Sequence, residues 1–462
     1  MTLIKSISGI RGTIGGAQGE NLTPIDAVKY AAAYGAWIKQ QRDKSLHKIV
    51  VGRDARISGH MVQELVMQTL VGMGIHVVDL GLSTTPTVEV AVVLEKADGG
   101  IILTASHNPK QWNALKLLNN KGEFLNAEAG QEILNIAENG KIDFADVDAL
   151  GQITINDAYI DIHIEEILNL PLVNVEAIKK AKFKVVVDAV NSTGGIAVPL
   201  LLEALGVDPV KLYCTPNGQF PHNPEPLKEH LGDLMELVVK EKADFGLVVD
   251  PDVDRLAFVD ENGDMFGEEY TLVAVADYIL QNTPGNTVSN MSSSRALRDV
   301  TNKYGCSYTA SAVGEVNVVD LMKETHAVIG GEGNGGIIYP ELHYGRDSLV
   351  GIALFLSHLA EINSSVSELR KGYPAYFASK NKIQLTPELD VEGILKAMEA
   401  KYSSEDINTI DGVKIDFEEK WVHLRKSNTE PIIRIYTEAK SQQAADDLAE
   451  RFINEIIEIS KS

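Results

Sequence analysis

Ile49-Val50-Val51-Gly52-Arg53-Asp54-Ala55-Arg56-Ile57-Ser58-Gly59 joins an apolar strand to a small polar loop, and a helix from Met61 to Gly72 is expected to follow. A glycine and a second strand come next, at Gly74-Ile75-His76-Val77-Val78. The same order of strand, polar loop, helix, glycine and strand starts again at Val185 and at Val288. Strands that alternate with helices across short turns predict α/β units on largely parallel sheets.

The sequence changes character after Gly372-Tyr373-Pro374. Lys380–Leu385 and Gly412–Phe417 have the composition of strands, and Val391–Tyr402 that of a helix. Gln442–Ile459 has apolar residues at helical spacing, which predicts a final amphipathic helix. This part of the chain is therefore expected to form a small α+β domain.

The length of 462 residues allows several domains. We predict an α/β protein of four domains, in which three related α/β domains with mixed, largely parallel sheets and a smaller α+β C-terminal domain surround a central cleft. The predicted domains are residues 1–155, 156–267, 268–374 and 375–462.

The composition excludes some functions. The formal charge is -23 and the basic residues form no run, which argues against binding to nucleic acid. Met1–Gly12 lacks the apolar core of a signal peptide, and no stretch approaches the roughly 18 apolar residues of a membrane helix. Cys214 and Cys306 lie far apart without metal-ligand spacing. We expect a cytoplasmic protein that does not bind membranes.

Four polar loops carry the candidate chemistry, one in each predicted domain. The first is Thr104-Ala105-Ser106-His107-Asn108-Pro109, which follows the apolar run Gly99–Leu103. A serine there is also typical of a turn or a helix cap. The other loops are Asp250–Arg255, Gly331–Gly336 and Arg425–Pro431. Together they offer a nucleophile, a metal site, a sugar site and an anion site, as phosphoryl transfer to a sugar phosphate requires.

Three aspartates, Asp250, Asp252 and Asp254, follow the apolar strand Phe245–Val249. A bent loop can direct all three carboxylates at one hard cation, whereas without a cation they would repel one another. A solvated acidic turn is the alternative. A calcium EF-hand is excluded because Arg255 occupies the glycine position, and the loop also lacks the haloacid-dehalogenase pattern. We expect Mg²⁺.

The last two loops are candidate ligand-binding loops. Ser427, Asn428 and Thr429 lie between Arg425 and Arg434, so hydroxyls, amides and guanidinium groups can converge on a dianion. A simple surface turn is the alternative.

The Gly331–Gly336 loop sets Glu332 and Asn334 among four glycines, which let the backbone approach a ligand. It lacks the lysine of a nucleotide P-loop. Arg11, in the Ser8–Thr13 loop, is a weak signal by itself.

In this order, the loops resemble those of the α-D-phosphohexomutase superfamily over essentially the whole chain. Thr104–Pro109 matches the phosphoserine loop and Asp250–Arg255 the metal loop. Gly331–Gly336 matches the sugar-specificity loop and Arg425–Pro431 the phosphate-binding loop.

The resemblance implies a heart-shaped enzyme of four domains with Ser106 carried as phosphoserine. Ser106 would pass its phosphoryl group to the free hydroxyl of a hexose phosphate. The resulting hexose 1,6-bisphosphate, which is also the activator, would turn over and return its other phosphate to the serine. Mg²⁺ on the three aspartates would also touch the seryl phosphate.

The resemblance also assigns roles to single residues. The reacting phosphate would be surrounded by Arg11, His107, Lys116 and Arg255, with Lys116 or Arg11 serving the proton transfers. Glu332 would bind sugar hydroxyls. The distal phosphate would be held by Arg425, Ser427, Asn428, Thr429 and Arg434.

Two departures from the family pattern bear on the substrate. Asn113-Ala114 stands where many members have Asn-Gly, and Asn334-Gly335-Gly336 stands where many have Ser-Gly-His. The missing histidine puts a histidine acid or base at this loop in doubt. The Glu-Gly-Asn-Gly-Gly variant resembles the phosphoglucosamine mutase and phosphoglucomutase/phosphomannomutase branch. The Asn334 carbonyl could accept from a 2-ammonium, and the same amide could bind a 2-hydroxyl.

We therefore favour glucosamine phosphate as the substrate, with glucose or mannose phosphate as the alternative. A non-catalytic sugar-phosphate-binding protein would have lost the serine or the metal carboxylates, and both are present. A metal-dependent phosphatase would use the same chemistry with water as acceptor. We expect a monomer or a homodimer.

Overall fold

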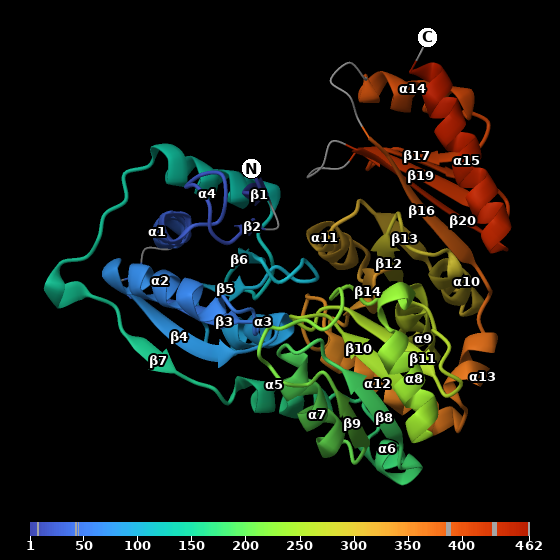
Figure 1. Cartoon of the computed structure of the whole chain (residues 1–462), viewed down its shortest axis with the longest axis horizontal. Helices are drawn as coiled ribbons and strands as arrows, with labels where there is room; N and C mark the ends of the chain where they lie inside the picture. Colours follow the sequence, from blue (N-terminus) through green and yellow to red (C-terminus); the bar gives the residue numbers. More distant parts are fainter. Residues whose placement is uncertain (7–8, 42–43, 45, 385–389, 427–431, 461–462) are drawn as a thin grey trace. The chain divides into compact units, whose positions relative to one another are not determined.

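The computed structural model describes residues 1–462 except 7–8, 42–43, 45, 385–389, 427–431 and 461–462. These residues divide into two compact units, and Figure 1 colours them by their position in the sequence. Unit 1 comprises Met1–Tyr278 and Asn334–Leu369, and unit 2 comprises Ile279–Gly333 and Arg370–Ser462.

The first sheet of unit 1 contains seven strands: β1 (Ile4–Ser6), β2 (Gly9–Thr13), β3 (His47–Arg53), β4 (Ile75–Leu82), β5 (Gly99–Leu103), β6 (Trp112–Leu118) and β7 (Ile153–Ile155). Their order across the sheet is β1-β2-β6-β5-β3-β4-β7. β3 is parallel to β4 and β5, whereas β6 is antiparallel to β5 and β2. The sheet is therefore mixed.

Helices cover both faces of this sheet: α1 (Pro24–Gln41), α2 (Gly59–Gly72), α3 (Thr85–Leu94) and α4 (Ala127–Asn139). Successive side chains of a strand point to opposite faces. Ile49 and Val51 of β3 pack in the core with α1, α2 and α4, whereas Val50 packs with Val88 of α3 on the other face. This explains why the strands read as continuous apolar runs.

The second sheet of unit 1 contains four strands: β8 (Lys184–Asp188), β9 (Asp208–Leu212), β10 (Phe245–Val249) and β11 (Leu256–Asp260). Their order is β11-β10-β8-β9, and only β11 is antiparallel to its neighbour. The other elements in this part of the chain are α5 (Tyr159–Leu168), α6 (Val175–Ala181), α7 (Gly194–Ala204), α8 (Gly232–Glu241), β15 (Gly336–Ile338), α12 (Ser348–Ile362) and the 3-10 turns Val147–Ala149 and Lys228–His230. α9 (Glu268–Asn282) and α13 (Val366–Lys371) each cross a boundary between the units.

The third sheet has four strands, of which β12 (Thr287–Asn290), β13 (Tyr308–Ser311) and β14 (Ile329–Glu332) belong to unit 2. β12 is central and parallel to both neighbours. The helices that follow β12 and β13 in the chain are α10 (Ala296–Lys303) and α11 (Glu315–Thr325).

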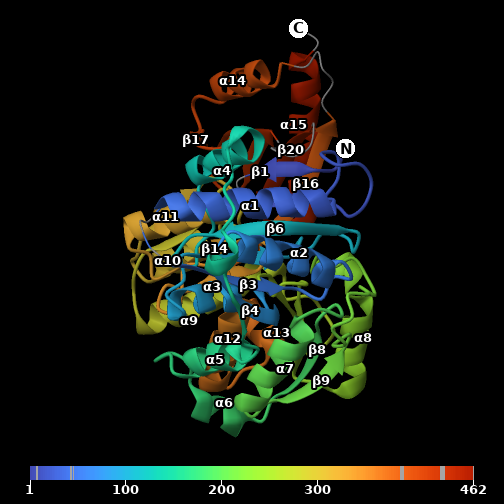
Figure 2. The same ribbon diagram turned by 90° about the vertical axis from the view of Figure 1, so that its left-hand side faces the viewer.

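The C-terminal sheet is antiparallel, in the order β16-β20-β19-β18-β17. Its strands are β16 (Phe377–Gln384), β17 (Asp406–Asn408), β18 (Val413–Asp416), β19 (Trp421–Lys426) and β20 (Ile432–Ala439). Figures 1 and 2 show α14 (Val391–Lys401) and α15 (Gln442–Ile459) together on one face of this sheet. Phe452 of α15 and Met398 of α14 are both fully buried in the core between helices and sheet. The predicted α+β domain is confirmed.

The predicted threefold repeat appears in the order of the strands. β3, β8 and β12 are interior strands of their sheets, and each pairs in parallel with the next strand in the sequence and with the one after it. The Ser106 loop joins β5 to β6, the Asp250 loop joins β10 to β11, and residues 333–335 join β14 to β15. Three of the four candidate loops thus occupy the same place in three copies of one motif, and the predicted fold class is confirmed.

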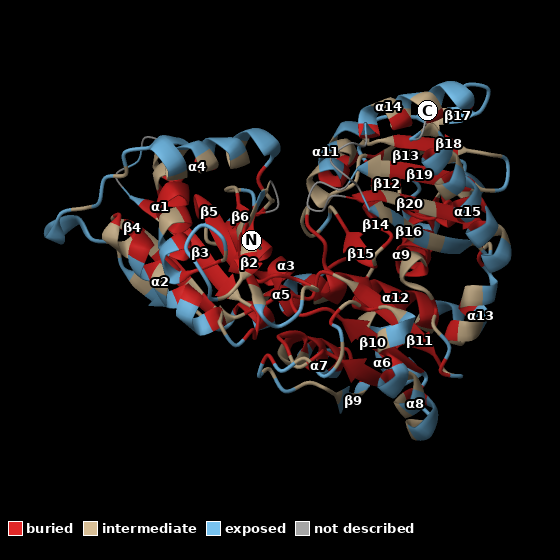
Figure 3. Cartoon of the chain, turned by 45° about the horizontal axis from the view of Figure 1, so that its top comes forward, coloured by how far each residue is buried: buried red, intermediate tan, exposed pale blue. Residues whose placement is uncertain are grey.

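The buried residues run along the strands of each sheet (Figure 3). Among the described residues, no helix is both long and apolar enough to cross a membrane.

Candidate active site

Ser106 lies at the end of β5 in a strained backbone conformation. Its φ is +48°, in the left-handed region that a serine rarely adopts, and its side chain is buried at 8% exposure. The Ser106 amide donates to Thr104 Oγ1 at 2.9 Å, and Thr104 Oγ1 donates to Asp54 Oδ2 at 2.7 Å. Such strain persists only where surrounding contacts fix it, and it is typical of functional sites.

Arg56 supplies most of those contacts from the loop after β3. Its guanidinium pairs with Asp54 at 3.0 Å, and both side chains are fully buried. The same guanidinium donates to four backbone carbonyls of the serine loop, those of Ser106, Asn108, Pro109 and Trp112, at 2.5 to 2.9 Å. A planar donor with five N–H groups suits this task, because one side chain then fixes a whole loop.

Asp250 meets the serine from the end of β10. Ser106 Oγ donates to Asp250 Oδ2 at 2.8 Å, and Asp250 Oδ1 accepts from the amides of Asp254 and Arg255. The loop turns at Val253, where φ is +66°. Burial, together with the carboxylates of Asp254 and Asp252, raises the pKa of Asp250 well above its ordinary value.

Asp252 is paired with a lysine from β6. Burial acts to raise the pKa of Asp252, but the Lys116 ammonium at 2.8 Å outweighs it and holds that pKa well below its ordinary value. Thr85, at the start of α3, donates to the same carboxylate oxygen at 2.6 Å. Burial likewise acts to lower the pKa of Lys116, but Asp252 and Asp254 raise it, so the pair is a buried ion pair.

Asp254 is paired with an arginine that lies just before α12. Arg346 donates to Asp254 Oδ2 at 2.7 Å, and Lys116 Nζ is 3.6 Å from the same oxygen. The Ser348 amide also donates to the Val253 carbonyl at 3.1 Å. The start of α12, which follows the aspartate loop in the sequence, therefore holds this loop together with Lys116, which precedes it.

The three aspartates fit a divalent cation. One oxygen from each lies within 4.8 Å of the others, and all three side chains are fully buried. Among the described residues, Asp252 Oδ1 and Asp254 Oδ1 are buried without a hydrogen-bond partner. A buried oxygen without a partner is costly, and carboxylate oxygens are the preferred ligands of hard cations.

Three further cationic or titratable groups, His107, Arg11 and Arg255, are linked by electrostatic interactions. His107 Nδ1 is 3.4 Å from Ser106 Oγ. Burial and the nearby Arg255 guanidinium lower the pKa of His107 well below its ordinary value, so His107 is neutral at physiological pH. Burial and Arg255 also lower the pKa of Arg11. Arg255 itself pairs with Glu225 at 3.2 Å.

Glu332 lies in unit 2, at the end of β14, and is 6% exposed. Its Oε1 accepts from Asn290 Nδ2 at 2.9 Å and from the Gly314 amide at 3.3 Å. Asn290 ends β12, so two neighbouring parallel strands fix the carboxylate at their carboxyl ends. Ligands of α/β sheets bind at such ends.

Arg425 and Arg434 are directly opposite each other on β19 and β20. Residues at opposite positions of an antiparallel pair point to the same face. Arg425 Nε also lies 3.3 Å from Asp411 Oδ2, which orients its guanidinium. Ser427, Asn428 and Thr429, the other predicted phosphate ligands, lie outside the described residues.

Asn334 belongs to unit 1, where its Oδ1 accepts from the Gly336 amide at 3.2 Å. The next residue, Gly335, has φ +84° and accepts from the Leu256 amide at 3.2 Å. A Cβ on Gly335 would lie 2.0 Å from the Leu256 carbonyl oxygen, so only glycine fits here. Asn334 is thereby held beside the end of the aspartate loop.

Sequence profiles of all four domains of one family match the chain. The phosphoglucomutase/phosphomannomutase alpha/beta/alpha domains I, II and III match residues 3–143, 161–263 and 267–376, and the C-terminal domain matches 361–455. The chain belongs to this family. It is therefore a member of the α-D-phosphohexomutase superfamily, as the loops predicted, and an enzyme of the isomerase class that acts as an intramolecular phosphotransferase.

Relatives match this phosphohexomutase over nearly its whole length. A phosphoglucomutase/phosphomannomutase of Thermococcus kodakarensis is 38% identical, with 95% of this chain and 96% of the relative covered. A phosphoglucosamine/phosphogalactosamine mutase of Sulfurisphaera tokodaii is 33% identical, with 98% and 97% covered. A crystal structure of a phosphoglucomutase/phosphomannomutase family protein from Burkholderia thailandensis is 26% identical, with a TM-score of 0.84 and 99% and 98% covered.

Two arginines that support the site of this phosphohexomutase, Arg56 and Arg346, were not predicted from the sequence. Arg56 stands in the opening repeat, but its only sequence signal was the Asp54-Ala55-Arg56 spacing that lets the two side chains pair. Arg346 carries no motif, because its partner Asp254 is 92 residues away in the sequence. Ser106, Asp250, Asp252, Asp254 and Lys116 are brought together as the sequence predicted, and their catalytic roles stay predictions.

Proposed function

We propose that this phosphohexomutase carries a phosphoryl group on Ser106 and exchanges it with a hexose phosphate through a hexose 1,6-bisphosphate. The observation that carries this proposal is the 2.8 Å hydrogen bond from Ser106 Oγ to Asp250, inside a cluster of three buried aspartates. A bound metal ion explains why a serine hydroxyl lies beside three buried carboxylates, because the ion would bind both the carboxylates and a phosphoryl group on the serine.

The surroundings of Ser106 suit a phosphorylated serine. Phosphorylation replaces the hydroxyl proton that Asp250 accepts and adds about two negative charges beside three carboxylates. Asp250, Asp252 and Asp254 would hold Mg²⁺, which when bound offsets these charges and polarises the phosphoryl oxygens. Lys116 and Arg255 supply positive charge from the protein itself.

The proton transfers are assigned to Lys116 or Arg11. Lys116 is held as a cation by Asp252 and Asp254, so it can donate a proton or stabilise charge but is a poor base while both pairs persist. Burial and Arg255 lower the pKa of Arg11, whereas Asp252 and Asp254 raise that of Lys116. His107 is neutral and close enough to Ser106 Oγ to hydrogen-bond to it.

The distal phosphate would bind the C-terminal domain. Arg425 and Arg434 present two guanidinium groups on the same face of adjacent strands. Ser427, Asn428 and Thr429 lie between these strands in the sequence and would add hydroxyls and amides. A bisphosphate that must reorient before its second phosphate reacts needs such a site, whereas a phosphatase, which transfers to water, does not.

Glucosamine phosphate is the proposed substrate, in line with the name of the Sulfurisphaera tokodaii relative. Glu332 is the proposed ligand of the sugar hydroxyls, and its buried carboxylate is fixed by Asn290 and Gly314. Asn334 would accept a hydrogen bond from the 2-ammonium through the second lone pair of its carbonyl.

Glucose or mannose phosphate is the second candidate, and the Nδ2 donor of Asn334 is the observation that would suit it. Asn334 Oδ1 already accepts a hydrogen bond from the Gly336 amide. The Nδ2 group can therefore offer a ligand more hydrogen bonds than Oδ1 can. A donor suits a 2-hydroxyl and not a 2-ammonium. The Thermococcus kodakarensis relative is named for these neutral sugars.

A comparison of kcat/KM for glucosamine 6-phosphate, glucose 1-phosphate and mannose 1-phosphate, with Mg²⁺ and a trace of bisphosphate, tests the substrate. We expect the amino sugar to be preferred by more than about tenfold, which corresponds to about 1.4 kcal/mol of transition-state binding. Comparable values for the neutral sugars would replace this proposal by the second candidate. A monomeric or homodimeric state stays a prediction.

A further inference from the structure

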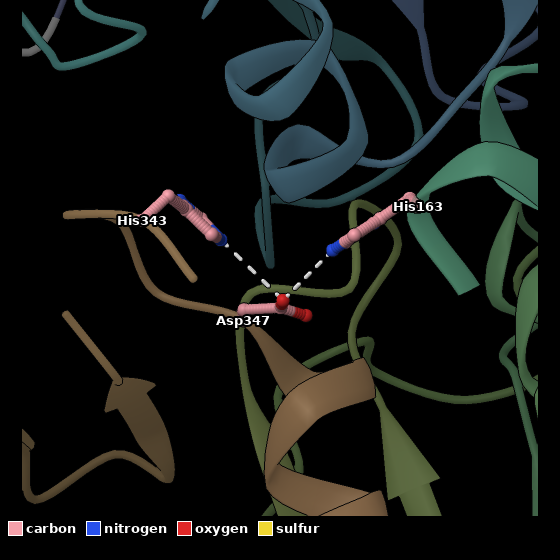
Figure 4. Close-up of side chains that lie close together, drawn as sticks. All are labelled: His163, His343 and Asp347. Carbon is pink, nitrogen blue, oxygen red and sulfur yellow. Dashed lines mark hydrogen bonds and ion pairs between the residues drawn. The ribbon is translucent and has the colours of Figure 1, made fainter. Parts of the chain in front are cut away.

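A second group of potential metal ligands lies in unit 1, away from the three aspartates. It consists of His163 of α5, His343 in the loop before α12 and Asp347 at the start of α12 (Figure 4). Figure 4 shows the two imidazole rings directed at the Asp347 carboxylate from opposite sides. The His163 and Asp347 side chains are fully buried and that of His343 is 7% exposed. No step proposed above uses this group.

The spacing of these three side chains is that of ligands around a transition metal. Asp347 Oδ2 is 3.0 Å from His163 Nε2 and 3.4 Å from His343 Nε2, and all three ligand atoms lie within 4.8 Å of one another. In a tetrahedral site with bonds of about 2.0 to 2.1 Å, neighbouring ligand atoms are about 3.3 Å apart. The three side chains could thus bind an ion with little movement.

Contacts to the Nδ1 atoms of both histidines orient their Nε2 atoms toward Asp347. His163 Nδ1 is 3.0 Å from Thr87 Oγ1, and His343 Nδ1 is 3.2 Å from Glu89 Oε2, so both rings turn Nε2 toward Asp347. The other oxygen of Asp347 accepts from the amides of Leu349 and Val350 and caps α12. Histidines that bind metals usually have their second nitrogen fixed by a hydroxyl or carboxylate in this way.

The charges of the group also favour a cation. Glu89 and Asp347 bring two carboxylates that are at most 1% exposed. A divalent cation bound by the two histidines and Asp347 would offset the negative charge of these carboxylates. Protons on the histidines are the competing solution, and the test below separates the two.

From this geometry we infer that His163, His343 and Asp347 form a second metal site, specific for a transition metal of the Zn²⁺ type and not for Mg²⁺. Two imidazole nitrogens and one carboxylate are typical ligands of Zn²⁺, whereas Mg²⁺ prefers oxygen. The inference does not depend on the proposed mutase reaction.

The position of the site indicates a structural role. Its ligands and their partners come from α3, α5 and the start of α12, and Arg346, which donates to Asp254, precedes Asp347 directly. Thr85 of α3 donates to Asp252. An ion here would join α5 to the start of α12, which supports the aspartate loop through Arg346.

The test is a Co²⁺ titration of chelator-stripped full-length protein in millimolar Mg²⁺, which competes with Co²⁺ for the three aspartates. We expect about one Co²⁺ per chain with the intense visible bands of a four- or five-coordinate site, and displacement by Zn²⁺. His343→Gln and His163→Gln should each weaken Co²⁺ binding by about tenfold to 100-fold or more.

Two control variants locate the binding. His358→Gln removes another buried histidine that lies 3.8 Å from a carboxylate, that of Asp277, and should leave Co²⁺ binding unchanged. Asp252→Asn damages only the first cluster and should also leave it unchanged. X-ray absorption of the wild-type protein should show two imidazole ligands, which keeps the test valid if the histidine variants fail to fold.

Binding that survives both histidine variants, or that is lost in Asp252→Asn, would place the ion elsewhere and overturn the inference. Absence of Co²⁺ and Zn²⁺ binding between pH 7 and 9 would show that His343 and Asp347 form only a proton-stabilised ion pair.

Discussion

Ser106 Oγ lies 2.8 Å from Asp250 Oδ2, although the two residues are 144 positions apart in the sequence. Ser106 follows β5, which is parallel to β3. Asp250 follows β10, which is parallel to β8 in the same way. Two copies of the same structural motif thus meet through equivalent loops, and the contact combines a nucleophile from one with a metal carboxylate from the other.

Replacement of Ser106 by alanine should abolish mutase activity. We expect kcat to fall by at least about 10³-fold with glucose 1,6-bisphosphate present, because no other hydroxyl of the loop occupies this position. Ser58→Ala, a serine of the neighbouring loop whose Oγ accepts from Asn113, is the matched control and should stay near wild type. Full activity of the Ser106→Ala enzyme would contradict the proposed transfer through Ser106.

Loss of Asp252 should weaken Mg²⁺ binding. Asp252→Asn removes one of three converging carboxylates and also leaves Lys116 without its closest partner. We expect the Mg²⁺ concentration for half-maximal activity to rise by at least about tenfold, since ligand charge controls the affinity for hard cations. If Asp252→Asn bound Mg²⁺ as tightly as wild type in calorimetry, the metal assignment would be wrong.

Arg346→Lys should reduce kcat/KM, although Arg346 was not among the site residues predicted from the sequence. The change removes a guanidinium that donates to Asp254 at 2.7 Å in a buried position. A lost charge-assisted hydrogen bond of about 1.5 to 3 kcal/mol corresponds to about ten- to 100-fold in kcat/KM. Arg451→Lys, in an exposed i,i+4 pair on α15, is the control. Equal activities of the two variants would refute a role for Arg346.

His222 should stabilise the protein more at low pH than at high pH. Burial acts to lower the pKa of His222, but Asp188 at 3.0 Å outweighs it and raises that pKa above its ordinary value. A raised folded-state pKa means that the stabilisation is fully present below the unfolded-state value, about 6.5, and is lost as the pH rises through the folded-state value.

Urea unfolding of wild type and His222→Gln checks this. The difference in free energy of unfolding should be larger at pH 5.5 than at pH 9. A difference that stays constant or grows with pH would contradict the assignment of the His222–Asp188 pair.

The fold was predictable from the sequence where local pattern determines it. The β5 strand Gly99–Leu103 and the α15 helix Gln442–Ile459 occur as the apolar runs predicted, because burial on both faces of a sheet or on one face of a helix leaves a direct trace in composition. The Ser106 and Asp250 loops were found for the same reason, since each follows such a strand, whereas the other two loops were found by their polar and glycine-rich composition.

The supports of the site could not be predicted. Arg56 and Arg346 act through carbonyls and a carboxylate that the chain brings near them only after folding. The His163–His343–Asp347 group joins residues 184 positions apart, and its members carry no motif spacing. Interactions between elements depend on tertiary packing, which composition and periodicity do not record.

The most direct test of the account follows labelled phosphate on Ser106 in a single turnover. Enzyme labelled by hexose 1,6-bisphosphate and then mixed with excess glucosamine 6-phosphate should pass its label to the sugar bisphosphate at a rate at least equal to kcat. Label that stays on the enzyme, or leaves as inorganic phosphate at the rate of turnover, would contradict the claim that Ser106 carries the transferred group.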